Sequence, residues 1–132
     1  VTFGVVDGFT HQILVLKCCT DNKSLTLLDA LLESKMVKER SLPIFIRGDG
    51  GLENAAIAKL TNSVNGVRHF LSGRSVHNQR IERMWRDVYT NVIGYYKTAL
   101  ENIIEYYDVE LNPYNVWIIQ RIFLEGINEE LR

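Results

Sequence analysis

Residues 43–54 read Pro-Ile-Phe-Ile-Arg-Gly-Asp-Gly-Gly-Leu-Glu-Asn, an apolar run that stops at a glycine-rich turn. The apolar residues 44–46 predict a buried strand, and Asp49 comes directly after it. In open α/β sheets, ligands bind beyond the carboxyl ends of the strands, so an acid at this position is a candidate functional residue. Gly50 and Gly51 can adopt positive φ and let the chain turn sharply. The alternative is that Asp-Gly-Gly is only a turn.

The segments on both sides of this turn alternate between strand and helix patterns. We predict a hairpin over residues 2–18, a helix over 24–39 capped by Asn22 or Ser24, a strand within 43–49, a helix over 52–64, a strand over 67–71, a helix over 75–97, and a C-terminal helical part over 99–132 with a closing helix at 114–124. This order predicts an α/β fold, a sheet covered by helices, in a single domain over residues 1–132.

Composition sets broad limits on what the chain does. Its 132 residues suffice for one domain, and 46% hydrophobic with 23% charged residues is ordinary for a globular protein. No apolar run approaches the length of a membrane span, so we expect no membrane partner. The adjacent Cys18 and Cys19 suggest no disulfide framework, which favours a reducing, intracellular setting.

Charge is unevenly distributed although the net charge is only −1. Five arginines lie between Arg68 and Arg86, with Glu82 as the one acid among them. A basic segment of this kind marks a surface for a polyanion, or a solvated helix face.

Glu82 is the second acid that is a candidate functional residue, because helical spacing places it at the edge of the apolar stripe of the helix predicted over 75–97. Taken alone, it is an exposed glutamate that pairs with Arg86 four residues on. Taken with Asp49, it is the second of two carboxylates from different elements, which is what two-metal phosphoryl chemistry needs.

At this point the chain resembles a known family. Residues 47–54, Arg-Gly-Asp-Gly-Gly-Leu-Glu-Asn, resemble the Thr-Asp-x-Gly-x-Glu-Asn segment of retroviral and retrotransposon integrases. Residues 5–11, Val-Val-Asp-Gly-Phe-Thr-His, resemble their Val-Asp-x-Phe-Ser-Arg hairpin. Residues 73–87, Gly-Arg-Ser-Val-His-Asn-Gln-Arg-Ile-Glu-Arg-Met-Trp-Arg-Asp, are similar to a string of the integrase-core proteins of animal genomes.

The resemblance implies an RNase H-like mixed sheet flanked by helices, and DNA integration by two-metal phosphodiester cleavage and strand transfer. It implies that Asp49 and Glu82 are catalytic and bind metal, as the second and third members of an Asp-Asp-Glu triad with two Mg²⁺ (or Mn²⁺) ions. It implies DNA as partner, contacted by Asn78, Arg83 and Arg86, a homo-oligomer in the complete protein and, in a eukaryote, a nuclear location.

The first triad aspartate has no counterpart in this chain by the family's topology. That residue lies on the first strand, and two further strands precede the first helix, whereas only one strand follows Asp7 before the helix. We therefore expect Asp7 to be a turn residue and the first strand to lie upstream of Val1. A fragment without that strand has two sheet pieces that lack their shared partner, and is inactive.

Two other functions stay open at this point. The chain is alternatively a catalytically inactive, domesticated or decayed module that binds DNA or protein. Replacements relative to the family's motifs, such as Gly48 in place of threonine, support this alternative. A nuclease acting on RNA–DNA hybrids is the third alternative, but it explains the string over residues 73–87 poorly.

Overall fold

A computed structural model describes residues 1–39, 41–73 and 79–132 of the chain. The described residues form two compact units, Val1–Glu82 and Arg83–Arg132. The helices and strands, in chain order, are β1 (Thr2–Val6), β2 (Ile13–Cys18), α1 (Ser24–Leu32), α2 (Lys35–Glu39), β3 (Ile46–Asp49), the 3-10 turn η1 (Leu52–Asn54), α3 (Ala55–Asn65), β4 (Phe70–Gly73), α4 (Gln79–Val88), the π-helical turn η3 (Tyr89–Ile93), α5 (Gly94–Tyr107) and α6 (Pro113–Glu130). Whether residues 1–132 form a single domain stays a prediction.

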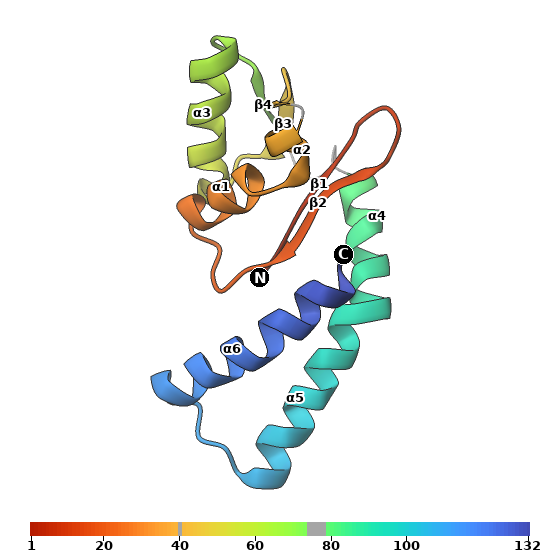
Figure 1. The fold of residues 1–132 in the computed structure, drawn as a ribbon, viewed down its shortest axis with the longest axis vertical. Coiled ribbons are helices and arrows are strands. Elements are labelled where there is room, and N and C mark those ends of the chain that lie inside the picture. Colours follow the sequence, from red (N-terminus) through yellow and green to blue (C-terminus); the bar gives the residue numbers. More distant parts are fainter. Residues whose placement is uncertain (40, 74–78) are drawn as a thin grey trace. The chain divides into compact units, whose positions relative to one another are not determined.

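The strands of the first unit form two separate pairs (Figure 1). β1 and β2 are antiparallel, with Thr2 opposite Cys18, and β3 and β4 are parallel, with Asp49 opposite Gly73. Among the described residues no strand joins the two pairs. Small sheets of both kinds flanked by helices confirm the α/β prediction and agree with an RNase H-like fold.

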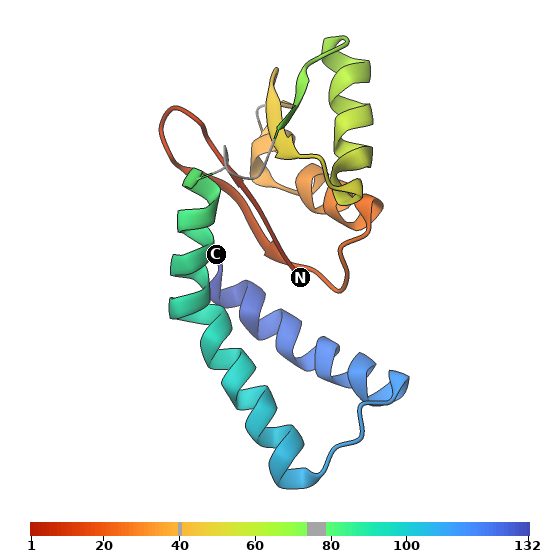
Figure 2. The ribbon, with the colours of Figure 1, turned by 180° about the vertical axis from the view of Figure 1, so that it is seen from behind.

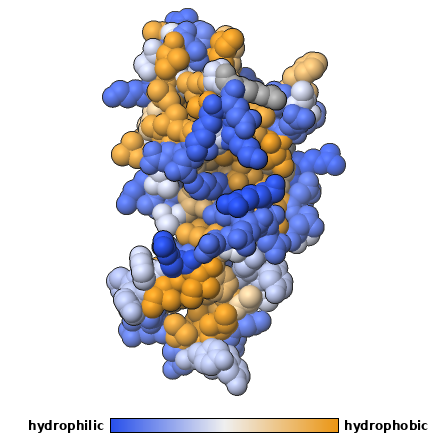
Figure 3. All heavy atoms as spheres, in the orientation of Figure 1, coloured by the Kyte–Doolittle hydropathy of each residue, from blue (hydrophilic) through white to orange (hydrophobic). Residues whose placement is uncertain are grey.

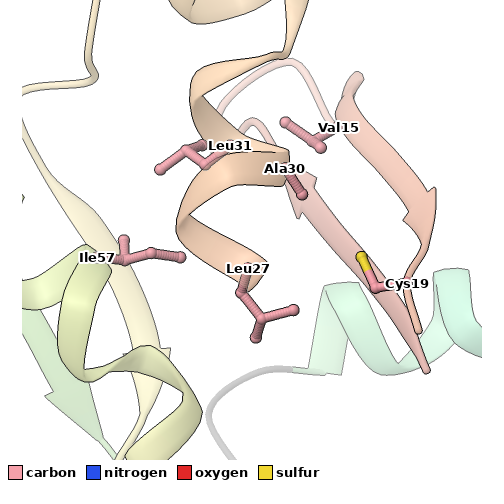
Figure 4. Close-up of a cluster of buried hydrophobic side chains, with 6 residues drawn as sticks. All are labelled: Val15, Cys19, Leu27, Ala30, Leu31 and Ile57. Carbon is pink, nitrogen blue, oxygen red and sulfur yellow. The ribbon is translucent and has the colours of Figure 1, made fainter. Parts of the chain in front are cut away.

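Helix α1 carries the core of the first unit. Its side chains Leu27, Ala30 and Leu31 are buried, and Leu31 is only 1% exposed. Figure 4 shows them between Val15 and Cys19 of the hairpin segment and Ile57 of α3, and these six residues form one buried cluster. The apolar contacts of α1, rather than hydrogen bonds between strands, therefore connect the hairpin to the rest of the unit.

The helix predicted over 24–39 is broken in two. Ser34 lies between α1 and α2; its hydroxyl donates to the Leu31 carbonyl at 2.6 Å and accepts from the Val37 backbone N–H. Serine competes with the helical backbone for hydrogen bonds in this way, which explains the interruption. The predicted cap was also wrong, because Lys23 is the N-cap residue and makes no side-chain cap hydrogen bond.

Both strands around the glycine-rich turn begin later than the apolar residues predicted. β3 begins at Ile46, and Ile44 and Phe45 are 64% and 60% exposed. The Ile44 carbonyl accepts from the Asn65 amide at 3.2 Å and lies 3.0 Å from Nδ1 of His69, so side chains, not a neighbouring strand, are its partners. β4 begins at Phe70, after a turn in which Gly66 and Arg68 have positive φ.

Asn62 of α3 fixes where β4 begins. Its side-chain oxygen accepts from the backbone N–H groups of His69 and Phe70, each at 2.9 Å. Figure 2 shows α3 alongside the β3–β4 pair from behind. This one side chain therefore ties the helix to the strand that lies next to β3.

The second unit is helical and leaves much of its apolar surface exposed. The helix predicted to end near 97 continues through η3 and α5 to Tyr107, and the closing helix extends to Glu130. Tyr96 packs edge-on against Phe123 and next to Gly126, which joins the start of α5 to α6. Hydrophobic side chains gather on the surface at the α5 and α6 end (Figure 3); Tyr114, Trp117 and Ile122 of α6 are each at least 60% exposed. No helix in the described ranges is both long enough and apolar enough to span a bilayer.

The Asn62 contacts predict a pair of variants. Asn62→Ala removes the acceptor of two backbone N–H groups that are partly buried, and an unsatisfied donor costs about 1–3 kcal/mol. Asn62→Asp keeps an acceptor oxygen in the same place. We expect urea unfolding monitored by circular dichroism to give a lower midpoint for Asn62→Ala than for Asn62→Asp. Equal midpoints for the two variants would contradict this role.

Candidate active site

Asp49 is the last residue of β3 and lies opposite Gly73, the last residue of β4, in the parallel register. The carboxyl ends of parallel strands meet at one edge, where ligands bind in open α/β sheets. Asp49 is half-buried. The predicted strand end is therefore confirmed, and the carboxylate lies where a substrate can reach it.

One carboxylate oxygen of Asp49 is held in place. The side-chain amide of Asn54 donates to Oδ1 at 2.7 Å, and the backbone N–H of Gly51 is 3.4 Å from the same atom. Among the hydrogen bonds of the described residues, none involves Oδ2 of Asp49. Asp49 therefore has one oxygen fixed by the protein and one oxygen available to a ligand.

Gly48 makes this arrangement possible. A Cβ at this position would lie 2.8 Å from the Phe70 ring and 3.3 Å from the Asn54 amide nitrogen. Gly50 and Gly51 do not adopt the positive φ that is open to glycine, since Gly66 is the one glycine in the described segments with φ above zero. Gly51 instead has φ −67 and ψ 146, an extended conformation that leads into η1. The glycine that matters most here permits a close approach, not a left-handed turn.

The first part of the helix predicted over 75–97 that the structure describes is α4, which contains Glu82, Arg83 and Arg86. All three residues are exposed. Glu82 and Arg86, four residues apart, lie on one side of the helix, and no ion pair joins them within the described part of the chain. The predicted DNA contact Asn78 lies outside the described residues.

Asp49 and Glu82 offer carboxylate oxygens, the hard donors that Mg²⁺ and Mn²⁺ prefer. Their ligand type fits a divalent cation, and one oxygen of Asp49 accepts no hydrogen bond from the described residues. The number of ligands is too small for a complete site, because no three or more His, Cys, Asp or Glu side chains lie together among the residues that the structure covers. A complete site of the predicted type needs a further carboxylate.

Asp7 is a turn residue. Its carboxylate accepts from the Thr10 hydroxyl, from the Thr10 backbone N–H at 3.0 Å and from the Phe9 backbone N–H at 3.3 Å. These hydrogen bonds, that of the Thr10 side chain first, lower the pKa of the Asp7 carboxyl from its ordinary value. The carboxylate closes the β1–β2 loop, as expected of a turn residue.

Sequence reasoning quoted Asn54 and Gly48 only as parts of a motif and missed what they do. The signal in the sequence was the asparagine five residues after Asp49, which the start of the following helix brings back to the strand end.

A separate shallow pocket is lined by Asn22, Lys23, Ser24, Leu52 and Glu53, and none of the predicted site residues lines it.

Comparison with known proteins adds one finding. The model of a family described as integrase core domain matches residues 1–132, the whole chain. No curated protein and no solved structure gives a significant match.

The crowding around Gly48 predicts a contrast between two glycines. Gly48→Ala forces the Phe70 ring and Asn54 apart, at a cost of about 1–3 kcal/mol for overpacking. Gly50→Ala is the matched control, since its Cβ would meet only the Ser72 hydroxyl at 3.6 Å. We expect chemical unfolding to show a loss of stability for Gly48→Ala only. A loss of the same size in both would mean that the turn rejects any side chain.

The Asp7 hydrogen bonds predict a pH effect. A carboxyl with a lowered folded-state pKa stabilises the fold above its unfolded pKa of about 3.9, and this contribution is lost as the pH falls through the folded pKa. Asp7→Asn keeps the shape and lacks the charge. We expect the thermal midpoint of the natural protein to exceed that of Asp7→Asn at pH 6, and the difference to shrink toward pH 2. A difference that does not change with pH would contradict the assignment.

Proposed function

Because the chain belongs to the integrase core domain family, we propose that it contributes two catalytic carboxylates, Asp49 and Glu82, to a DNA-joining active site. The observation that carries this proposal is the Asp49 carboxylate at the end of β3. One oxygen is held by Asn54 at 2.7 Å, and the other makes no hydrogen bond among the described residues. A carboxylate that is fixed on one side and open on the other is suited to bind a cation.

Two Mg²⁺ or Mn²⁺ ions in the complete site would supply Lewis-acid chemistry, activating the attacking water or DNA 3′-hydroxyl and stabilising the leaving oxygen. Asp49 and Glu82 would hold the cations as hard oxygen ligands. We propose that the third carboxylate comes from a strand that precedes Val1 in the complete protein. Such a strand would also give the two strand pairs of the first unit a shared neighbour.

DNA is the proposed partner, as the family's role in general implies. Arg83 and Arg86 are exposed on α4, next to Glu82 in sequence, and their guanidinium groups match phosphate oxygens in geometry and charge. Asn78 is proposed as a third contact. These contacts position the backbone and neutralise its charge, so binding should weaken with salt. We propose in addition a homo-oligomeric complete protein and, in a eukaryote, a nuclear location.

The proposal is tested by Glu82→Gln in the protein that contains this chain. The substitution keeps the size of the side chain and removes a negative ligand, so Mg²⁺-dependent strand transfer should fall to the level measured without metal. DNA affinity, measured by fluorescence anisotropy, should change little because the arginines remain. Both are measured on the same preparation, with strand transfer followed on a labelled DNA end.

Glu101→Gln is the matched control. Glu101 is also an exposed helical glutamate, and it pairs with Lys97 at 3.8 Å. Its replacement should leave strand transfer intact. If Glu82→Gln keeps full activity, the assignment of Glu82 is wrong. If the unaltered protein binds DNA and joins none, the non-catalytic module becomes the better reading.

A further inference from the structure

Asn54 occupies the N-cap position of α3 and does not cap the helix. Asparagine is among the strongest N-cap residues because its side-chain oxygen accepts from an N–H in the first turn. Here the residue has φ −86 and ψ −4, a helical conformation, and makes no side-chain cap hydrogen bond. The chain is already helical through η1, so the Asn54 side chain has no helix end to cap.

The Asn54 amide is directed to the candidate metal ligand instead. Its Nδ2 donates to Oδ1 of Asp49 at 2.7 Å, which is short for an N–H donor and typical of a bond to an ionised acceptor. The second donor to Asp49, the Gly51 N–H at 3.4 Å, reaches the same oxygen. Both donors therefore hold one oxygen and leave Oδ2 to other ligands.

Packing holds the Asn54 side chain in this position. The place where a Gly48 Cβ would lie is 3.3 Å from Nδ2 and 3.5 Å from Cγ of Asn54. The Phe70 ring lies near the same point, and Phe70 packs against the buried cluster of the unit. The amide therefore fills the space above a residue without a side chain, next to a ring anchored in the core.

The chemistry of the donor matters as much as its place. A lysine or arginine at this position would also hold a carboxylate, but its positive charge would repel a divalent cation nearby. A neutral amide orients the carboxylate and leaves its charge available. Partners of this kind orient the ligand, and their loss typically weakens metal binding about 10- to 100-fold.

We propose that Asn54 is a positioning residue for Asp49, fixing Oδ1 so that Oδ2 is presented to a hard divalent cation. The inference rests on the proposed function, because it takes Asp49 as a metal ligand. It adds a residue for which the sequence alone predicted no contact.

The test uses Mn²⁺ alone as the probe, titrated into the millimolar range at which sites with few carboxylates bind. Binding is followed by electron paramagnetic resonance and by paramagnetic broadening of the Gly50 and Gly51 amide signals. We expect Asn54→Ala to weaken Mn²⁺ binding at this position about tenfold. Its stability should also fall, because the hydrogen bond to Asp49 and the packing of the amide are lost, so the Mn²⁺ affinity of the folded variant is the deciding measurement. Asp49→Asn should abolish the broadening.

Asn65→Ala is the matched control. Asn65 belongs to the same helix and donates to the carbonyls of Pro43 and Ile44, away from Asp49. Its loss should lower stability and leave Mn²⁺ affinity unchanged, whereas Asn54→Ala should lower both. Asn54→Leu, which keeps the branched shape without a donor, replaces the alanine variant if that variant does not fold.

The outcomes separate the two proposals. If Asp49→Asn loses Mn²⁺ and both Asn54 variants bind it like the natural chain, Asn54 is structural and this inference is wrong while the metal site stands. If Asp49→Asn binds Mn²⁺ as tightly as the natural chain, the metal site of the proposed function fails and Asn54 has no ligand to position.

Discussion

The burial of one face of helix α1 is the contact on which the first unit depends. The two strand pairs share no strand in the described part of the chain, so no backbone ladder connects them. Leu27, Ala30 and Leu31 of α1 connect them instead, by packing against the hairpin segment and α3. Apolar packing is non-directional, whereas a ladder fixes register, so the placement of each pair relative to α1 depends on shape complementarity.

Polar side chains provide the precision that apolar packing lacks. Asn62 and Asn65 bond backbone groups of the segments that lead into β4 and β3. These contacts decide the strand ends, and hydrophobicity alone could not predict them. Ile44 and Phe45 look like strand residues in the sequence, yet the Ile44 carbonyl is taken by Asn65 and Phe45 stacks on His69 with ring centroids 4.6 Å apart. The apolar pattern predicted that a strand exists there, and missed where it begins.

The candidate site, like the strand before it, was predictable only in part. The position of Asp49 at a strand end follows from an apolar run that stops at glycines, and the structure confirms it. The partner of Asp49 was not predictable by the same rules, because helical spacing places Asn54 in the first turn of the helix predicted over 52–64 and assigns its side chain no contact. Only the close approach permitted by Gly48 brings the Asn54 amide to the carboxylate. A glycine that stands where relatives of this family have threonine therefore need not signal decay.

The hydrogen bonds to their carboxylate oxygens distinguish Asp49 from Asp7. Asp7 accepts hydrogen bonds on both oxygens, from Thr10 and Phe9, and these bonds close its loop. Among the described residues, Asp49 accepts on one oxygen only, and from neutral donors. A cation gains most from a carboxylate that is oriented but not neutralised, since orientation reduces the entropy lost on binding and the full charge remains. Within the described part of the chain, the two aspartates thus differ in how many of their oxygens accept hydrogen bonds, two in Asp7 and one in Asp49.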